Sequence, residues 1–122
     1  MIEKIITSIE NALRGLRQAY HFDRSFRMEV AGAAGFTAVA WLLWPLSGIE
    51  IILLAVAYGL IFITELFNTA LEQLLLRVHP EEHELIGMSK NTASAAVLLA
   101  FIVATVIVTV LLLAHFRIVP IL

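Results

Sequence analysis

The stretch "IILLAVAYGLIFITELFNTALEQLLL", residues 51–76, decides the fold because it is long, apolar and interrupted by only two charged residues, Glu65 and Glu72. A helix of this length would extend about 39 Å, which exceeds the ~30 Å of hydrocarbon that a transmembrane helix must cross. We therefore predict a membrane-spanning helix over 51–76. It would carry two carboxylates and the amide of Asn68 into or near the lipid.

Two further segments have the same apolar character. Residues 30–49 contain no charged residue, and residues 91–115 contain none apart from the terminal His115. We predict spans over both, with a cytoplasmic loop over 78–89. The composition agrees, since 61% of the residues are hydrophobic and a soluble domain has roughly 45–50%. A chain of 122 residues has too little interior for this surface, so much of it must face lipid or other subunits. The predicted fold class is an all-α membrane protein.

The segment 1–27 has a different pattern. Its apolar residues recur at steps of three and four: Ile5, Ile9, Leu13, Leu16 and Tyr20. This spacing predicts an amphipathic helix that lies in the membrane interface, and it is equally compatible with packing against the rest of the protein. The segment lacks the continuous apolar block of a secretory signal, so we expect it to belong to the mature chain.

The distribution of basic residues predicts the orientation. Basic residues precede the first span and flank the loop 78–89, and only one follows the third span: Lys4, Arg14, Arg17, Arg24, Arg27, Arg77, Lys90 and Arg117. Because cytoplasmic loops carry the excess of Lys and Arg, the N-terminus and the loop are expected in the cytoplasm and the C-terminus outside. The net charge of −2 and the lack of a basic tail argue against nucleic acid as a partner.

The polar residues of the second span share one face. On a helix, Asn68 lies about 60° and Glu72 about 20° from Glu65. A charge at mid-bilayer costs at least ~2.5–3.5 kcal/mol on insertion scales, so these acids need partners or a position close to water. They could simply bridge neighbouring helices through hydrogen bonds, as in a structural membrane subunit, or serve proton-coupled transport in a small oligomeric transporter.

A third interpretation of the acids is catalytic. Asp23 and Glu29 precede the first span and Lys90 opens the third, all on the expected cytoplasmic side. Oxygen ligands gathered there suit Mg²⁺, which prefers carboxylates, phosphate oxygens and retained waters. His79 and His83 are predicted to be solvated loop residues, and His115 to anchor the outer interface.

Five motifs carry a resemblance to a known family: "GLRQA" (15–19), "FRME" (26–29), "ELFNTALE" (65–72), "HELIGMSK" (83–90) and "SAAVLLA" (94–100). Over nearly its whole length the chain resembles the integral-membrane diacylglycerol kinases of bacteria and the related undecaprenol kinases. The resemblance implies a homotrimer in the bacterial inner membrane, with each active site built from neighbouring subunits. It also implies transfer of the γ-phosphoryl group of MgATP to the primary hydroxyl of diacylglycerol, which gives phosphatidic acid.

The resemblance assigns roles to individual residues. Glu65 matches the catalytic base, and Glu72 and Asp23 match metal-binding carboxylates. The residues that it places around the nucleotide are Asn68, Lys90, Asn91, Glu29 and Arg17. Phosphoryl transfer needs such a set, because a carboxylate must accept the hydroxyl proton while Mg²⁺ and a cation neutralise charge. Undecaprenol is the alternative lipid, but Glu29 favours diacylglycerol because undecaprenol kinases tend to have histidine there.

The chain departs from the family pattern at three positions. Asn91 stands where the family has an aspartate close to the nucleotide, Asp23 replaces a glutamate, and Leu76 stands where some members carry an aspartate. Asn91 is either a natural variant with weakened activity or a shifted role, or an engineered substitution that traps a substrate complex. We expect Asn91 to impair turnover.

Overall fold

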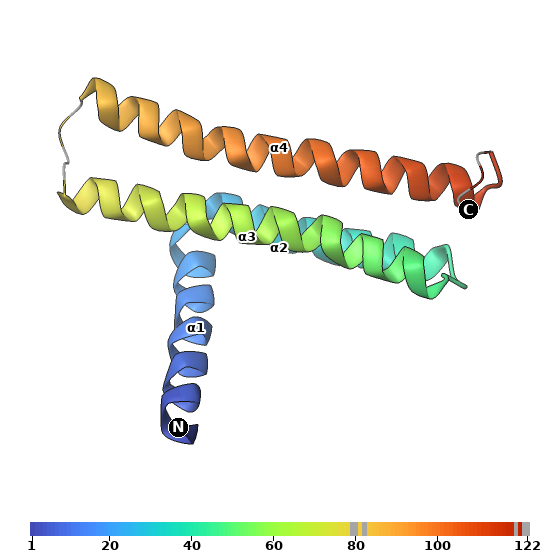
Figure 1. Ribbon diagram of the computed structural model, residues 1–122, viewed down its shortest axis with the longest axis horizontal. Helices are drawn as coiled ribbons and strands as arrows, with labels where there is room; N and C mark the ends of the chain where they lie inside the picture. The colour runs from blue at the N-terminus through green and yellow to red at the C-terminus, as the bar shows by residue number, and fades with distance from the viewer. Residues whose placement is uncertain (79–80, 82, 119, 121–122) are drawn as a thin grey trace.

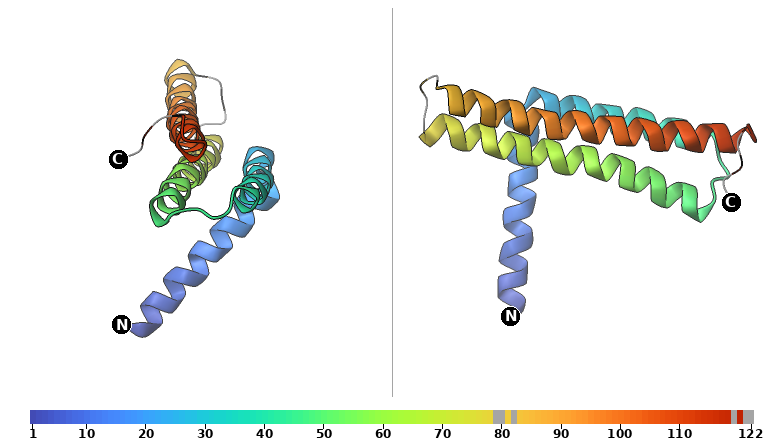
Figure 2. Two further views of the ribbon diagram at one scale, coloured as in Figure 1. Left: turned by 90° about the vertical axis from the view of Figure 1, so that its right-hand side faces the viewer. Right: turned by 45° about the horizontal axis from the view of Figure 1, so that its top comes forward.

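The computed structural model describes residues 1–78, 81, 83–118 and 120, and this part of the chain forms four helices. These are α1 (Ile2–Phe22), α2 (Arg24–Leu42), α3 (Gly48–Val78) and α4 (Glu84–His115). Helices α3 and α4 lie side by side and antiparallel, α2 runs along α3, and α1 projects steeply away from all three (Figures 1 and 2). The prediction of an all-α fold is confirmed.

The contact between α3 and α4 is the most extensive in the molecule. Its buried centre consists of Ala57 and Ile61 from α3 with Ala100 and Ala104 from α4. Three small side chains among these four allow the two backbones to approach closely, as in the interfaces of membrane helices. Both helices are long and apolar enough to cross a membrane. Large apolar side chains such as Phe67 remain exposed, which suits a lipid or protein environment around the pair.

The segment predicted as the first span, 30–49, is helical only as far as Leu42, where α2 ends. Pro45 explains this end, since proline has no N–H to donate and disfavours helical backbone in the residue before it. The helical part, 30–42, is about 20 Å long, which is less than the ~30 Å of hydrocarbon. At its other end, α2 begins at Arg24 and so takes over the last residues of the predicted interfacial segment 1–27.

Helices α3 and α4 extend beyond the predicted spans 51–76 and 91–115. Helix α3 already begins at Gly48 and continues to Val78, and α4 begins at Glu84. His83 is exposed, and its Nδ1 accepts a hydrogen bond from the Leu85 N–H at 3.1 Å, so it caps α4. The prediction for His79 lies outside the described residues. We call the end of α3 and α4 nearest residues 79–83 the loop end.

Residues 20–27 form a well-defined corner between α1 and α2, which we call the elbow. The Asp23 N–H donates to the Ala19 carbonyl at 2.8 Å, and Asp23 Oδ1 accepts from the Ser25 N–H at 2.8 Å. Asp23 therefore ends one helix and caps the next. Arg27 also stabilises this corner, because its Nη1 donates to the carbonyls of Tyr20 at 3.0 Å and His21 at 2.8 Å.

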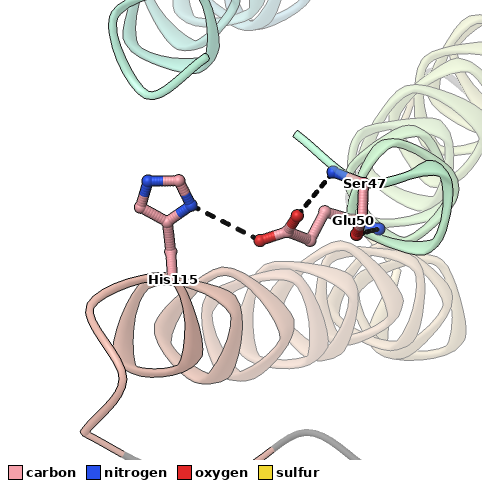
Figure 3. A network of polar contacts seen from close by, with 3 residues as sticks. All are labelled: Ser47, Glu50 and His115. Atoms are coloured by element: carbon pink, nitrogen blue, oxygen red, sulfur yellow. Dashed lines mark hydrogen bonds and ion pairs between the residues drawn. The ribbon is translucent and has the colours of Figure 1, made fainter. Parts of the chain in front are cut away.

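At the opposite end of the helix pair, Ser47, Glu50 and His115 form a cluster that we call the outer clasp (Figure 3). Glu50 Oε2 accepts from the Ser47 N–H at 2.7 Å, and Ser47 Oγ accepts from the Glu50 N–H at 3.3 Å. This reciprocal pair is a capping box at the start of α3. His115 Nδ1 lies 3.5 Å from Glu50 Oε1. The sequence predicted only an interfacial anchor at His115, and the structure adds this partner.

Candidate active site

A cavity of about 270 Å³ collects polar side chains from the elbow, α3 and α4. We call it the acidic cavity. It is lined by Asp23, Ser25, Glu65, Asn68, Glu72, Ser94 and Val97. Segments far apart in the sequence therefore meet at one place, with three carboxylates and one amide among the lining side chains.

Helix α3 supplies the central face of this cavity. The spacing of three and four residues between Glu65, Asn68 and Glu72 places them on one stripe of the helix. The structure brings all three to the wall of the same cavity. Glu65 is only 3% exposed, whereas Glu72 is exposed and lies about two turns closer to the loop end. The two acids thus differ in their access to solvent.

The polar groups of this face are largely unpaired within the part of the chain that the structure describes. Neither the Glu65 nor the Glu72 carboxylate takes part in a hydrogen bond or ion pair there. The Oδ1 atom of Asn68 is buried and also lacks a hydrogen-bond partner among these residues. Buried polar atoms are normally hydrogen-bonded, so such a group needs an explanation. Acceptor oxygens kept available for a ligand are one such explanation.

Glu29 lies within electrostatic reach of this face, although it does not line the cavity. It precedes the segment 30–49 that we predicted as a span. Burial raises the pKa of the Glu29 carboxyl, and repulsion from the charge of Glu65 raises it further. A cation bound near this pair of acids would relieve that repulsion, so the region is receptive to one.

The structure brings together four of the residues predicted for the site, namely Asp23, Glu65, Asn68 and Glu72. It does not bring Lys90, Asn91 or Arg17 to the cavity wall. Lys90 is half-buried and precedes Ser94 by four residues, so it lies on the same face of α4, one turn nearer the loop end. The side chains of Asn91 and Arg17 are exposed.

Sequence reasoning missed four residues at this site. Ser25, Ser94 and Val97 line the cavity, and Thr69 donates a hydrogen bond from Oγ1 to Asp23 Oδ2. Thr69 could have been found from the helical wheel, since it lies about 40° from Glu65. The others could not, because their positions depend on how the elbow and α4 approach α3.

The donor set of the cavity fits a hard divalent cation. Within the described residues, no three Asp, Glu, His or Cys side chains lie close enough to hold a metal ion by themselves. Mg²⁺ does not need such a cage, because it is usually bound by one or two carboxylates together with substrate phosphates and waters. Asp23, Glu72 and the amide oxygen of Asn68 offer ligands of this kind.

Two larger cavities flank the site. One of about 560 Å³ lies in the angle between α1 and α3, with Gly15, Leu16, Ala70 and Gln73 in its lining. Thr69, which donates to Asp23, lines it as well. Another of about 380 Å³ lies between α2 and α3 and is lined mostly by apolar and aromatic residues. Neither is lined by a carboxylate, so the acidic cavity is the better candidate for chemistry.

Comparison with known proteins shows which family the chain resembles. The family profile described as prokaryotic diacylglycerol kinase matches residues 10–112, a range that includes every residue lining the acidic cavity. The diacylglycerol kinase of Escherichia coli K12 is 38% identical over 114 residues, which cover 93% of this chain and 92% of that relative. The diacylglycerol kinase of Haemophilus influenzae is 32% identical over 103 residues (84% and 86%). That of Pseudomonas aeruginosa is 32% identical over 105 residues (86% and 85%).

Proposed function

The chain belongs to the prokaryotic diacylglycerol kinase family of membrane-embedded phosphotransferases, and we propose that it transfers the γ-phosphoryl group of ATP to the primary hydroxyl of diacylglycerol. The family membership confirms the resemblance drawn from the motifs. The observation that carries the proposal is the buried, unpaired carboxylate of Glu65 at the wall of the acidic cavity. It is an acceptor-only group with lone pairs available.

In this proposal, Glu65 acts as the general base. Its carboxylate accepts the proton of the lipid hydroxyl as the hydroxyl oxygen forms its bond to the γ-phosphorus. The bond from that phosphorus to the bridging oxygen breaks, ADP leaves, and phosphatidic acid is the lipid product. The position of Glu65, 3% exposed on an apolar helix, suits a hydroxyl that arrives from the membrane side.

Asp23 and Glu72 would hold Mg²⁺ beside the phosphates, with the Asn68 oxygen as a further acceptor. A Mg²⁺ ion held by these residues would supply positive charge to offset that of the nucleotide phosphates. Glu72 suits this role because it is exposed and so accessible to a nucleotide from the aqueous side. Glu29 interacts electrostatically with Glu65 and would therefore lie beside the bound nucleotide and metal ion.

Lys90, Asn91 and Arg17 would contact the nucleotide. Since none of them lines the acidic cavity within one chain, we propose that neighbouring subunits of a homotrimer complete each site. In the proposed orientation, α1 lies in the cytoplasmic interface and the loop end faces the cytoplasm. We propose that α3 and α4 cross the inner membrane, and that residues 30–49, in which the end of α2 is followed by non-helical residues, provide a third crossing.

A direct assay tests the proposed activity. The purified protein is given labelled ATP, Mg²⁺ and either diacylglycerol or undecaprenol in mixed micelles. We expect the labelled phosphoryl group to be transferred to diacylglycerol. Preferential labelling of undecaprenol would reassign the substrate, and no label on either lipid would contradict the proposal.

The variant Asn91→Asp tests the role of Asn91 in the same assay. It restores the acid that the family carries beside the lysine, and we expect it to raise turnover. Unchanged turnover would show that Asn91 does not limit catalysis.

A further inference from the structure

The hydroxyl of Thr69 departs from the pattern of most of the six other helical threonines. Five of these donate to a backbone carbonyl four residues earlier in their own helix: Thr7, Thr37, Thr64, Thr92 and Thr105. Such bonds are usual for threonine inside a helix. Thr69 instead donates to Oδ2 of Asp23, 46 residues earlier in the sequence. Its side chain therefore links α3 to the elbow.

The partner of this bond is a carboxylate that the fold holds at two points. Asp23 Oδ1 accepts from the Ser25 N–H at 2.8 Å, and Oδ2 accepts from the buried Thr69 hydroxyl. A carboxylate has about four lone-pair sites, so each oxygen keeps one for another ligand. The orientation of the Asp23 carboxylate is thus fixed, and its free lone pairs can still bind a ligand in the acidic cavity that it lines.

We propose that Thr69 is a positioning residue for phosphoryl transfer, which aims the Asp23 carboxylate into the acidic cavity and fixes the elbow against α3. The inference rests on the proposed function, in which Asp23 helps to bind Mg²⁺. Thr69 itself acts only through Asp23. Removing the partner that orients a metal-binding group typically costs about 10- to 100-fold in metal affinity or activity.

The chain offers well-matched variants for a test. Thr69→Val keeps the shape of the side chain and removes the hydroxyl, whereas Thr69→Ser keeps the hydroxyl. Thr64→Val is the control, because Thr64 lies on the same helix and donates only to its own backbone, at 2.8 Å to Leu60 and 3.0 Å to Ile61. Thr69→Ala serves as a second hydroxyl-free variant, without a methyl group against the carboxylate, should the valine variant fail to fold.

The first measurement does not depend on activity. Hydrogen exchange of the elbow, residues 20–27, is followed by mass spectrometry in the full chain without ATP or Mg²⁺. The bond from Thr69 to a charged carboxylate should oppose local opening of the elbow, so we expect elbow exchange to be at least about tenfold faster in Thr69→Val and Thr69→Ala. The Thr69→Ser and Thr64→Val proteins should match the wild type. Unchanged exchange in the hydroxyl-free variants would overturn the proposal.

The second measurement separates positioning from a merely structural contact. At saturating ATP and lipid, Thr69→Val should need about tenfold more Mg²⁺ for its half-maximal rate, with a smaller change in the limiting rate. Thr69→Ser should restore the wild-type Mg²⁺ dependence. A lower limiting rate with unchanged Mg²⁺ dependence would overturn the positioning role. A wild-type protein without kinase activity would instead refute the proposed function, and the exchange experiment would still decide whether Thr69 holds the elbow.

Discussion

Two of the three carboxylates on helix α3, Glu50 and Glu65, meet opposite surroundings. At the outer clasp, both oxygens of Glu50 have a partner, Ser47 on one side and His115 on the other. At the acidic cavity, Glu65 is more deeply buried, yet it has no hydrogen-bond partner in the described part of the chain, and its negative charge acts on the neighbouring Glu29. The same residue type thus caps the start of the helix at Glu50 and is left without a hydrogen-bond partner near its middle at Glu65.

The largest expected effect comes from Glu65→Gln, which keeps the shape of the side chain but removes the proton acceptor. General base catalysis typically contributes about 10²–10⁴-fold, so we expect kcat to fall by at least a hundredfold. The thermal midpoint should change little, because the carboxylate makes no hydrogen bond that the amide would break. Turnover within threefold of the wild type would contradict the assignment of Glu65 as the base.

A smaller effect is expected for Glu72→Gln, at the exposed side of the same cavity. Losing one metal-binding carboxylate should raise the Mg²⁺ concentration for the half-maximal rate by about 10- to 100-fold. High Mg²⁺ should recover part of the rate, which it should not do for Glu65→Gln. Equal responses of the two variants to Mg²⁺ would show that the two acids do not have distinct roles.

At the outer clasp, Ser47→Ala should affect stability and not activity. Loss of an N-cap side chain typically costs about 1 kcal/mol, which corresponds to a fall of a few degrees in the thermal midpoint. The kinase rate at 25 °C should remain within twofold of the wild type, because Ser47 lies at the far end of α3 from the acidic cavity. A large loss of kinase rate in folded Ser47→Ala protein would contradict the view that the outer clasp serves stability and the acidic cavity serves activity.

The smallest effect is expected for Glu50→Gln, which makes the same change from glutamate to glutamine as Glu65→Gln but at the outer clasp. The amide oxygen can still accept a hydrogen bond, so the loss should stay near 0.5 kcal/mol, as for other partly exposed ion pairs. Thermal unfolding in the same detergent checks this value. The pair Glu50→Gln and Glu65→Gln therefore compares one chemical change in two surroundings, and similar activities in both variants would remove the contrast.

Much of α3 follows from its sequence, because helical periodicity is a local property. The spacing of Glu65, Asn68 and Glu72 is sufficient to place them on one face, and the structure brings them to one cavity. The prediction that the first span is helical through residue 49 was wrong. The apolar character continues through 30–49, but Pro45 restricts the backbone before it, and α2 ends at Leu42.

The long-range pairs could not be predicted in this way. Asp23 meets Thr69, and Glu50 meets His115, across separations that no periodic pattern encodes. For Lys90, Asn91 and Arg17, the sequence leaves open which subunit's site each residue belongs to. Spacing along one chain carries no information on whether a side chain completes the site of its own subunit or of a neighbour.

The outer clasp also has a consequence for how the protein is made. Ser47 and Glu50 leave the ribosome well before His115, because most of α3 and all of α4 separate them in the sequence. The capping box can therefore form early, whereas its contact with the imidazole has to wait until α4 has been made and lies antiparallel to α3 (Figure 1). Closure of the clasp therefore marks the completed antiparallel packing of α4 on α3.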